Sequence, residues 1–175
     1  MPSFRESIVL CWFLLMLPVP VHAEAVTRSA QIFAQEFYDW YAPRAARNTP
    51  TPAWVSALKS RNSSFDPDLA RALKLDADAQ EHAARNIVGI DFDPFLGSQD
   101  PDDRYVVGPP ARKGGAYWAD VYGLSAGKKR DKPGAIIELE QRHGRWVIVN
   151  LRYSEGRDLL ATLILLKESR LRKPN

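Results

Sequence analysis

The stretch IDFDPFLGSQDPDD, residues 90–103, marks the point at which the chain changes from helical to strand patterning. Its two prolines and its glycine exclude a regular helix or a central strand, because proline has no amide hydrogen and glycine favours turns. The interleaved Phe92, Phe95 and Leu96 favour burial. We therefore predict a rigid loop that its aromatic side chains hold against the core.

Five aspartates lie in this loop, with no cation before Arg104: Asp91, Asp93, Asp100, Asp102 and Asp103. They can cap backbone amides, bind a cation or face a partner. The loop lacks the Asp-x-Asp-x-Asp-Gly pattern and the closing glutamate of a calcium-binding hand. A structural role is the favoured prediction, in which Asp91, Asp93 or Asp100 accepts backbone amide hydrogens and the Asp102-Asp103 pair faces solvent.

The N-terminus has the pattern of a secretory signal peptide. Arg5 precedes the uncharged run IVLCWFLLMLPVPV, residues 8–21, and Ala23 stands before Glu24 at a small-residue cleavage position. The run is too short, and too interrupted by proline, for a membrane span. Leu10 occupies the position where a lipoprotein signal needs a small residue before Cys11. We expect a signal peptide over 1–23 and a periplasmic or secreted single domain over 24–175, without a stable membrane anchor.

Composition argues against several kinds of chemistry. Cys11 is the chain's single cysteine and lies in the predicted signal peptide, so no disulfide or thiolate metal site is expected. Only His82 and His143 follow that segment, and no Gly-x-Ser-x-Gly motif or phosphate-binding glycine loop is present. We predict no metal, no cofactor and no assignable catalytic residue, and favour a non-enzymatic role.

The charge pattern points to a protein partner. The formal net charge is +3, which is not a polyanion-binding signature, and no nucleic-acid partner is expected. Acidic residues gather in 91–103, whereas basic residues gather at 112–113, 128–130 and 170–173. Separated acidic and basic surfaces suit recognition of another protein.

Helical patterning occupies the first half of the domain. Aromatic residues recur at three-to-four spacing from Val26, and Pro43 is expected to help end that helix. A short helix is predicted over 54–59. Asp66 and Pro67 then have the pattern of a helix start, with the aspartate as cap and the proline in the first turn.

Strand patterning follows over 105–107, 116–122, 135–141 and 145–153, and leucines at helical spacing follow residue 155. The last two strands are joined by residues 142–144, a short turn that makes them antiparallel neighbours. Both faces of strand 145–153 are largely apolar, so we predict a central or doubly covered strand. The pattern predicts an α+β fold with N-terminal helices on an antiparallel sheet of about four strands, and a C-terminal helix.

Three segments together resemble the domain-of-unknown-function 3828 family of small exported bacterial proteins. They are FYDWY (37–41), DFDPFL (91–96) with Gln99-Asp100, and WVIVN (146–150). The resemblance spans about Ser29 to Leu166, and its Asp-Pro-Phe and Gln-Asp motifs are the most specific. It implies a curved sheet similar to the cone of nuclear-transport-factor-2-like, or cystatin-like, domains, and it carries over no catalytic residue. The chain departs from lipid-anchored relatives in lacking a lipobox.

Two functions remain open at this point. The first is a periplasmic binding or interaction domain, for example an immunity-type inhibitor of an exported toxin. The second is a small-ligand carrier or enzyme with a pocket lined by Phe33, Phe37, Trp118 and Trp146, with Asp93 as its polar group. The candidate binding residues for these functions are Phe37, Tyr41, Asp91, Asp93, Phe95, Gln99, Asp100, Trp118 and Trp146, and the oligomeric state is left open.

Overall fold

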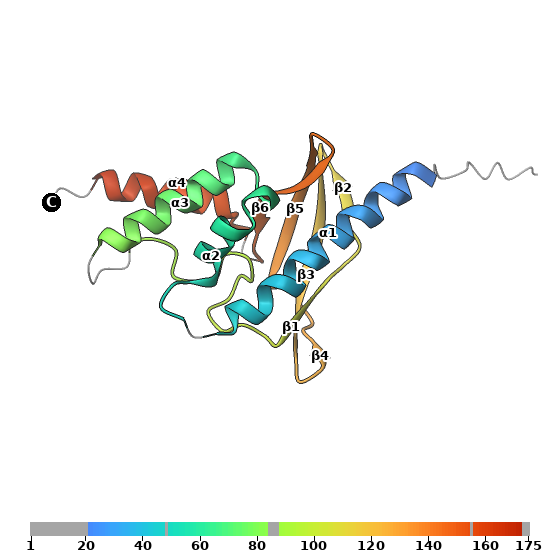
Figure 1. Cartoon of the computed structure of the whole chain (residues 1–175), viewed down its shortest axis with the longest axis horizontal. Coiled ribbons are helices and arrows are strands. Elements are labelled where there is room, and N and C mark those ends of the chain that lie inside the picture. Colours follow the sequence, from blue (N-terminus) through green and yellow to red (C-terminus); the bar gives the residue numbers. More distant parts are fainter. Residues whose placement is uncertain (1–20, 48, 84–87, 155, 173–175) are drawn as a thin grey trace, which may run out of the picture.

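The chain folds as an α+β domain in which helices pack on a curved antiparallel sheet, as the sequence predicts (Figure 1). The computed structural model describes residues 21–47, 49–83, 88–154 and 156–172. The described helices are α1 (Val21–Ala45), α2 (Ala53–Ser60), η1 (Asn62–Ser64, a 3₁₀ turn), α3 (Pro67–His82) and α4 (Leu159–Arg172). The described strands are β1 (Arg104–Val107), β2 (Ala111–Lys113), β3 (Ala116–Ser125), β4 (Lys128–Lys129), β5 (Ala135–Arg142) and β6 (Arg145–Arg152).

A local sequence signal sets the start of α3, but the proline signal does not set the end of α1. Asp66 caps α3 by accepting the amide hydrogen of Asp68 at 2.9 Å, and Pro67 occupies the first turn, which confirms the predicted start. Pro43, by contrast, lies inside α1, and Ala46 still donates to the carbonyl of Ala42 at 3.0 Å. A proline in the last turn removes a single helical hydrogen bond, so the helix continues past it.

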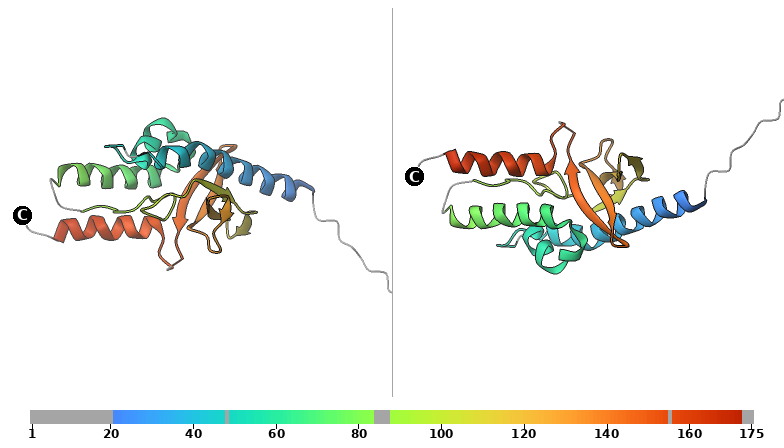
Figure 2. Two further views of the ribbon diagram at one scale, coloured as in Figure 1. Left: turned by 90° about the horizontal axis from the view of Figure 1, so that it is seen from below. Right: turned by 90° about the horizontal axis from the view of Figure 1, so that it is seen from above.

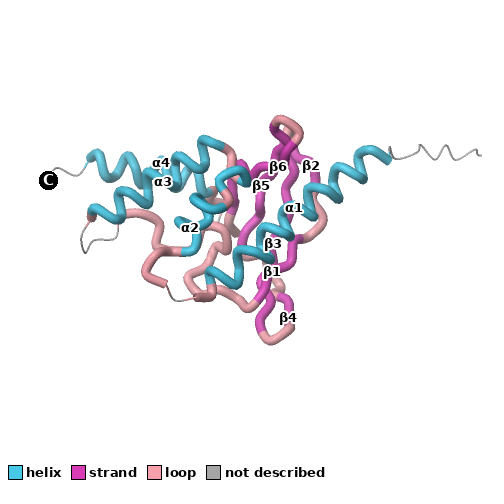
Figure 3. Tube along the Cα trace, in the orientation of Figure 1, coloured by secondary structure: helices cyan, strands magenta, loops and turns pink. Residues whose placement is uncertain are grey.

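The sheet has the strand order β1-β3-β5-β6, with β2 and β4 pairing with β3, and all of these pairs are antiparallel. Figure 3 shows the strands gathered at one end of the molecule and α2, α3 and α4 at the other. The turn between β5 and β6 consists of His143 and Gly144, which have φ values of 51° and 74°. Positive φ at both positions is the requirement of a tight hairpin turn, so the predicted antiparallel pair is confirmed.

Strand β6 lies at the end of the order β1-β3-β5-β6, so of the two predicted alternatives, a central or a doubly covered strand, the central one is wrong. It is nevertheless covered, because residues 147–151 are all buried. Its free edge is protected by the segment before α3, where the amide of Asp66 donates to the carbonyl of Ile148 at 2.9 Å beside a Phe65–Ile148 bridge. Apolar residues on both faces therefore reflect coverage by helices and loops, and not a neighbouring strand on each side.

The opposite edge of the sheet is protected by glutamine side chains of α1. Gln35 accepts the amide hydrogen of Val107 at 2.8 Å and donates to the carbonyl of Tyr105 at 3.0 Å. Gln31 donates to the carbonyl of Val107 at 3.0 Å. These bonds satisfy backbone groups of β1 that would otherwise be available for pairing with another strand.

Helices α3 and α4 project side by side away from the sheet, and the chain returns between them (Figure 2). A buried ion pair joins them, with Arg170 Nη1 2.6 Å from Asp76 Oδ1. The returning segment is tied to the same pair, because Asp76 accepts the amide hydrogen of Ile90 and Arg170 donates to the carbonyl of Val88. Among the residues described here, no helix is both long and apolar enough to cross a membrane.

Replacing Gln35 by leucine tests the edge protection. The amide of Val107 and the carbonyl of Tyr105 lose their partners, so we expect a loss of about 1 to 3 kcal/mol in the free energy of unfolding. The measurement is urea denaturation, with Glu36→Ala on the exposed face of the same helix as the control. Equal stability of the two variants would show that water replaces the glutamine without loss.

Candidate functional site

The loop of residues 91–99 is organised around the carboxylate of Asp93. Its Oδ1 accepts the amide hydrogens of Phe95 at 3.0 Å and Leu96 at 3.2 Å, and its Oδ2 accepts the hydroxyl hydrogen of Tyr41 at 2.5 Å. Asp93 also closes the loop through its backbone, donating to Ser98 and accepting from Gly97. A short aspartate is suited to this role, because its carboxylate reaches the amides two and three residues later.

Two more tyrosine hydroxyls hold the loop from outside. Tyr38 of α1 donates to the carbonyl of Phe95 at 2.8 Å, and Tyr153, just after β6, donates to the carbonyl of Pro94 at 2.8 Å. These carbonyls lie in a turn and have no ladder partner, so the hydroxyls supply the hydrogen bonds that burial demands. The loop is thereby attached both to the helical layer and to the end of the sheet.

The aromatic side chain of the loop fills the centre of the core. Phe95 is fully buried, with its ring centroid 5.4 Å from Phe37, 5.1 Å from Tyr41 and 5.2 Å from Phe65. The predicted burial of Phe95 is confirmed. Phe92 is only half-buried, with its ring edge-to-face against Tyr153 at 5.3 Å, so its predicted burial is wrong in degree. It lies before the turn, where the chain still runs along the surface.

The loop also needs glycine at one position. Gly97 has a φ of 65°, and a Cβ there would lie 2.3 Å from the carbonyl oxygen of Gly134. Gly134 precedes β5, and its own amide donates to Val121 of β3. The loop therefore lies directly against the backbone of the sheet, and a side chain at 97 would force the two apart.

Burial changes the acidity of the groups at the centre. Loss of solvent raises the pKa of Asp93 to about 6, although its hydrogen bonds to Tyr41, Phe95 and Leu96 act in the opposite direction. Burial, and then the nearby carboxylate, raise the pKa of the Tyr41 hydroxyl. Neither of the two described cavities, of about 410 and 290 Å³, is lined by Asp93. The geometry is that of a structural clasp that holds a proton-sensitive carboxylate.

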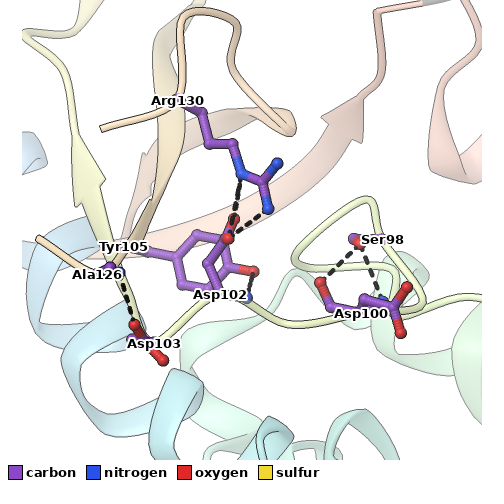
Figure 4. Close-up of polar contacts among 7 residues, drawn as sticks. All are labelled: Ser98, Asp100, Asp102, Asp103, Tyr105, Ala126 and Arg130. Atoms are coloured by element: carbon purple, nitrogen blue, oxygen red, sulfur yellow. Dashed lines mark hydrogen bonds and ion pairs between the residues drawn. The ribbon is translucent and has the colours of Figure 1, made fainter. Parts of the chain in front are cut away.

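The second half of the acidic stretch is bound to the hairpin of β3 and β4 (Figure 4). Arg130 donates to both carboxylate oxygens of Asp102, at 2.6 and 3.1 Å, while the amide of Asp102 donates to the hydroxyl of Tyr105. Asp103 accepts the amide hydrogen of Ala126 at 3.0 Å. The prediction that this pair faces solvent is wrong for Asp102, whose side chain is only 11% exposed. The β3–β4 hairpin thereby brings Arg130 against a loop that is distant in sequence.

The remaining acidic residues use backbone atoms. The carbonyl of Asp91 accepts from the Gln99 side chain at 3.0 Å, and the amide of Asp100 donates to the hydroxyl of Ser98 at 3.0 Å. Of the three predicted amide acceptors, Asp93 is the one that the described hydrogen bonds confirm. The carboxylates diverge toward separate partners, and within the described residues no group of three or more potential ligands is placed to hold a metal ion.

The four residues predicted to line one pocket, Phe33, Phe37, Trp118 and Trp146, do not lie together, and Phe33 is partly buried against the hydrophobic core. Phe37 and Tyr41 are in the core beside Phe95, whereas Trp146 lies near the start of α1, where its indole nitrogen donates to Ser29 at 3.1 Å. Trp118 projects from the opposite face of the sheet, because its neighbour Ala119 points into the core. The structure brings Phe37, Tyr41, Asp93 and Phe95 together, but it does not bring Trp118 or Trp146 to them.

The face of the sheet opposite α1 carries a second group of side chains, which we call the open face. The described helices leave this face of β3 and β5 uncovered, as Figure 2 shows. Cations stack on its two large rings, with Lys113 and Arg152 at 4.7 and 4.4 Å from the ring of Trp118 and Lys129 at 4.0 Å from that of Tyr122. Strand alternation in the sequence predicts that Trp118 and Tyr122 share a face, but it does not place the cations there.

Three buried polar atoms of this face have no hydrogen-bond partner among the described residues: Trp118 Nε1, Glu138 Oε2 and Arg152 Nε. Arg152 lies 3.3 Å from Glu138 and 3.4 Å from Asp158, so its charge is balanced although the hydrogen bonds are incomplete. Buried polar atoms are usually satisfied, and three exceptions on neighbouring residues mark this face as unusual.

A scan against protein-family models finds no match, and searches of curated proteins and of solved structures find none either. The resemblance to the domain-of-unknown-function 3828 family therefore stays a prediction.

Titration of Asp93 predicts a specific pH effect. Its pKa is about 6 in the folded chain and lower when exposed on unfolding, so the folded state binds the extra proton between about pH 4 and 6. This group's contribution to stability is therefore largest below about pH 4 and falls by about 3 kcal/mol as the pH rises to 6. When the free energy of unfolding is measured against pH, the wild type should lose stability relative to Asp93→Asn over that window. The two curves should therefore converge, or cross so that the variant becomes the more stable protein. Curves that stay parallel would refute the raised pKa.

Gly123 of β3 tests the Asp102 contact. A Cβ at this position would lie 1.8 Å from Asp102 Oδ2, so Gly123→Ala must displace the carboxylate from Arg130. We expect a loss of about 1 to 3 kcal/mol in the wild-type background and a much smaller one in Asp102→Ala. Denaturation of the four proteins of this cycle gives the coupling energy. Additive effects would mean that the carboxylate moves without loss.

Proposed function

We propose that this chain is an exported, non-catalytic binding domain that presents the open face of its sheet to a protein partner. The observation that carries the proposal is the uncovered face on which Trp118 and Tyr122 are stacked by cations. Aromatic residues and arginine are the side chains that most often dominate binding energy at protein interfaces.

The edges of the sheet favour recognition through the face. Gln35 occupies backbone groups of β1, and the segment at Asp66 occupies the carbonyl of Ile148 at the edge of β6. A partner strand cannot add to these positions without displacing the bonds already formed. Side-chain contacts on the open face require no such displacement.

The free charges on this face suit an acidic partner. Lys113 and Lys129 contact aromatic rings, and within the described residues neither forms an ion pair with a carboxylate. A partner carboxylate would gain a charge-assisted hydrogen bond from each lysine without breaking an existing salt bridge. Complementary charge of this kind also accelerates encounter between partners at low salt.

The N-terminal sequence supports the proposed compartment. The uncharged run over 8–21, followed by Ala23 and Glu24, supports export with removal of the leader, which places the partner in the periplasm or outside the cell. An inhibitor of an exported toxin is one function that needs such a domain and no catalytic residue.

Photo-crosslinking from the open face tests the proposal. A photoreactive phenylalanine analogue in place of Tyr122 should capture a discrete partner in intact cells, whereas the same analogue at Glu36, on α1, should not. The Lys113→Glu/Lys129→Glu variant should reduce the captured band about tenfold or more, because each charge reversal places like charges together at the interface.

The matched control is Lys59→Glu/Lys167→Glu, which makes the same change in net charge on exposed positions of α2 and α4. Equal loss of crosslinking in both double variants would show that net charge, and not the open face, governs binding. Absence of a discrete band from position 122 would refute the proposed surface. Mass spectrometry of the purified chain checks the export step, since an unprocessed N-terminus would contradict it.

A further inference from the structure

A groove of about 410 Å³ lies between the first turns of α1 and the far end of the sheet, on the side opposite the open face. Val26 of α1 and, in the unprocessed chain, Ala23 form one wall, and Tyr117 and Trp146 form the apolar part of the sheet side. Its volume falls within the range of small-molecule sites. It is remote from the Asp93 loop, so the clasp does not account for it.

The aromatic part of the groove is held in a fixed arrangement. The rings of Tyr117 and Trp146 pack edge-to-face, with centroids 5.3 Å apart and an interplanar angle of 85°. Trp146 Nε1 donates to Ser29 at 3.1 Å, so the indole has already used its hydrogen-bond donor inside the protein. The two rings therefore offer apolar surface in a defined orientation, which suits an apolar or aromatic group.

The charged side chain of the groove that is available to a ligand is a cation. Arg112, at the β2 wall, is exposed and forms no ion pair within the described residues. Glu140, which also lines the groove, is already paired with Arg142 at 3.0 Å. A guanidinium beside two aromatic rings favours a ligand that carries a carboxylate on an apolar body. The planar guanidinium can hold the carboxylate through two parallel hydrogen bonds.

We propose that this groove binds a small carboxylate with an aromatic or short apolar body. The carboxylate pairs with Arg112, and the apolar body packs on Tyr117 and Trp146. This ligand site is separate from the proposed partner surface, since Arg112, Tyr117 and Trp146 lie on the α1 side of the sheet.

Calorimetric titration with indole-3-acetate tests the proposal, and indole-3-acetamide is the matched neutral probe. The protein is used as cells process it, with its N-terminus read by mass spectrometry, because Ala23 lies at the expected cleavage position. We expect saturable binding of the acid, with the amide about tenfold weaker, since a charge-assisted hydrogen bond is replaced by a neutral one. Equal affinity for both probes, or no saturation with the acid, would overturn the proposal.

Three variants locate the site. Arg112→Ala should weaken the acid about tenfold and leave the amide unchanged, whereas Arg145→Ala, an exposed cation on β6 outside the groove, should change neither. Gly115→Leu should weaken both probes, because Gly115 lines the groove and a Cβ there meets no atom within 4 Å. Equal weakening by Arg112→Ala and Arg145→Ala, or normal binding by Gly115→Leu, would place the ligand elsewhere.

The two proposals fail independently. Lys113→Glu/Lys129→Glu should leave indole-3-acetate binding intact even where it abolishes partner capture. Loss of both in this variant would show that the groove and the open face do not act as separate sites.

Discussion

The hydrogen bond between the Tyr41 hydroxyl and the Asp93 carboxylate is the contact on which the arrangement of this domain depends. It joins α1 to a loop with no regular backbone pairing, and it orients the carboxylate that caps Phe95 and Leu96. With the loop fixed, Phe95 enters the aromatic cluster between the helices and the sheet. Removing a carboxylate from water is unfavourable, and the three donors around Asp93 are what make its burial tolerable. The raised pKa reflects the part of that cost that remains.

Polar side chains also set the position of elements that apolar packing alone would leave adjustable. The ion pair of Asp76 and Arg170 joins α3 to α4 and holds the returning chain between them. Breaking one partner of a buried pair leaves an uncompensated charge, so such a contact disfavours other arrangements of the same helices. Close approach reinforces it, because a Cβ at Gly89 would lie 2.5 Å from Asp76 Oδ2.

The sheet has protected edges and an uncovered open face, and this difference connects the fold with the proposed function. Gln31 and Gln35 serve as backbone partners for β1 while the same helix packs its aromatic face on the core. The sheet is thereby protected from pairing with other chains without a covering strand. Its face away from α1 keeps half-buried rings and cations in contact with solvent, where a partner can reach them. The groove near the start of α1 is a separate hollow, produced where the helix extends past the end of the sheet.

Several elements of the fold can be predicted from the sequence, because their signals are local. Asp66 and Pro67 predict the start of α3, the His143-Gly144 turn predicts the β5–β6 pair, and the Asp-Pro-Phe segment predicts a loop with Phe95 buried. These features depend on residues that are close in sequence, so their spacing can be read directly from the sequence. Other contacts depend on how distant segments pack. Arg130 reaches Asp102, Arg170 reaches Asp76, and the segment at Phe65 covers β6 across long sequence separations. No periodicity encodes such pairings, because they arise only when packing brings distant segments together. For the same reason, the sequence could not show that Trp118 and Trp146 lie apart from the aromatic core.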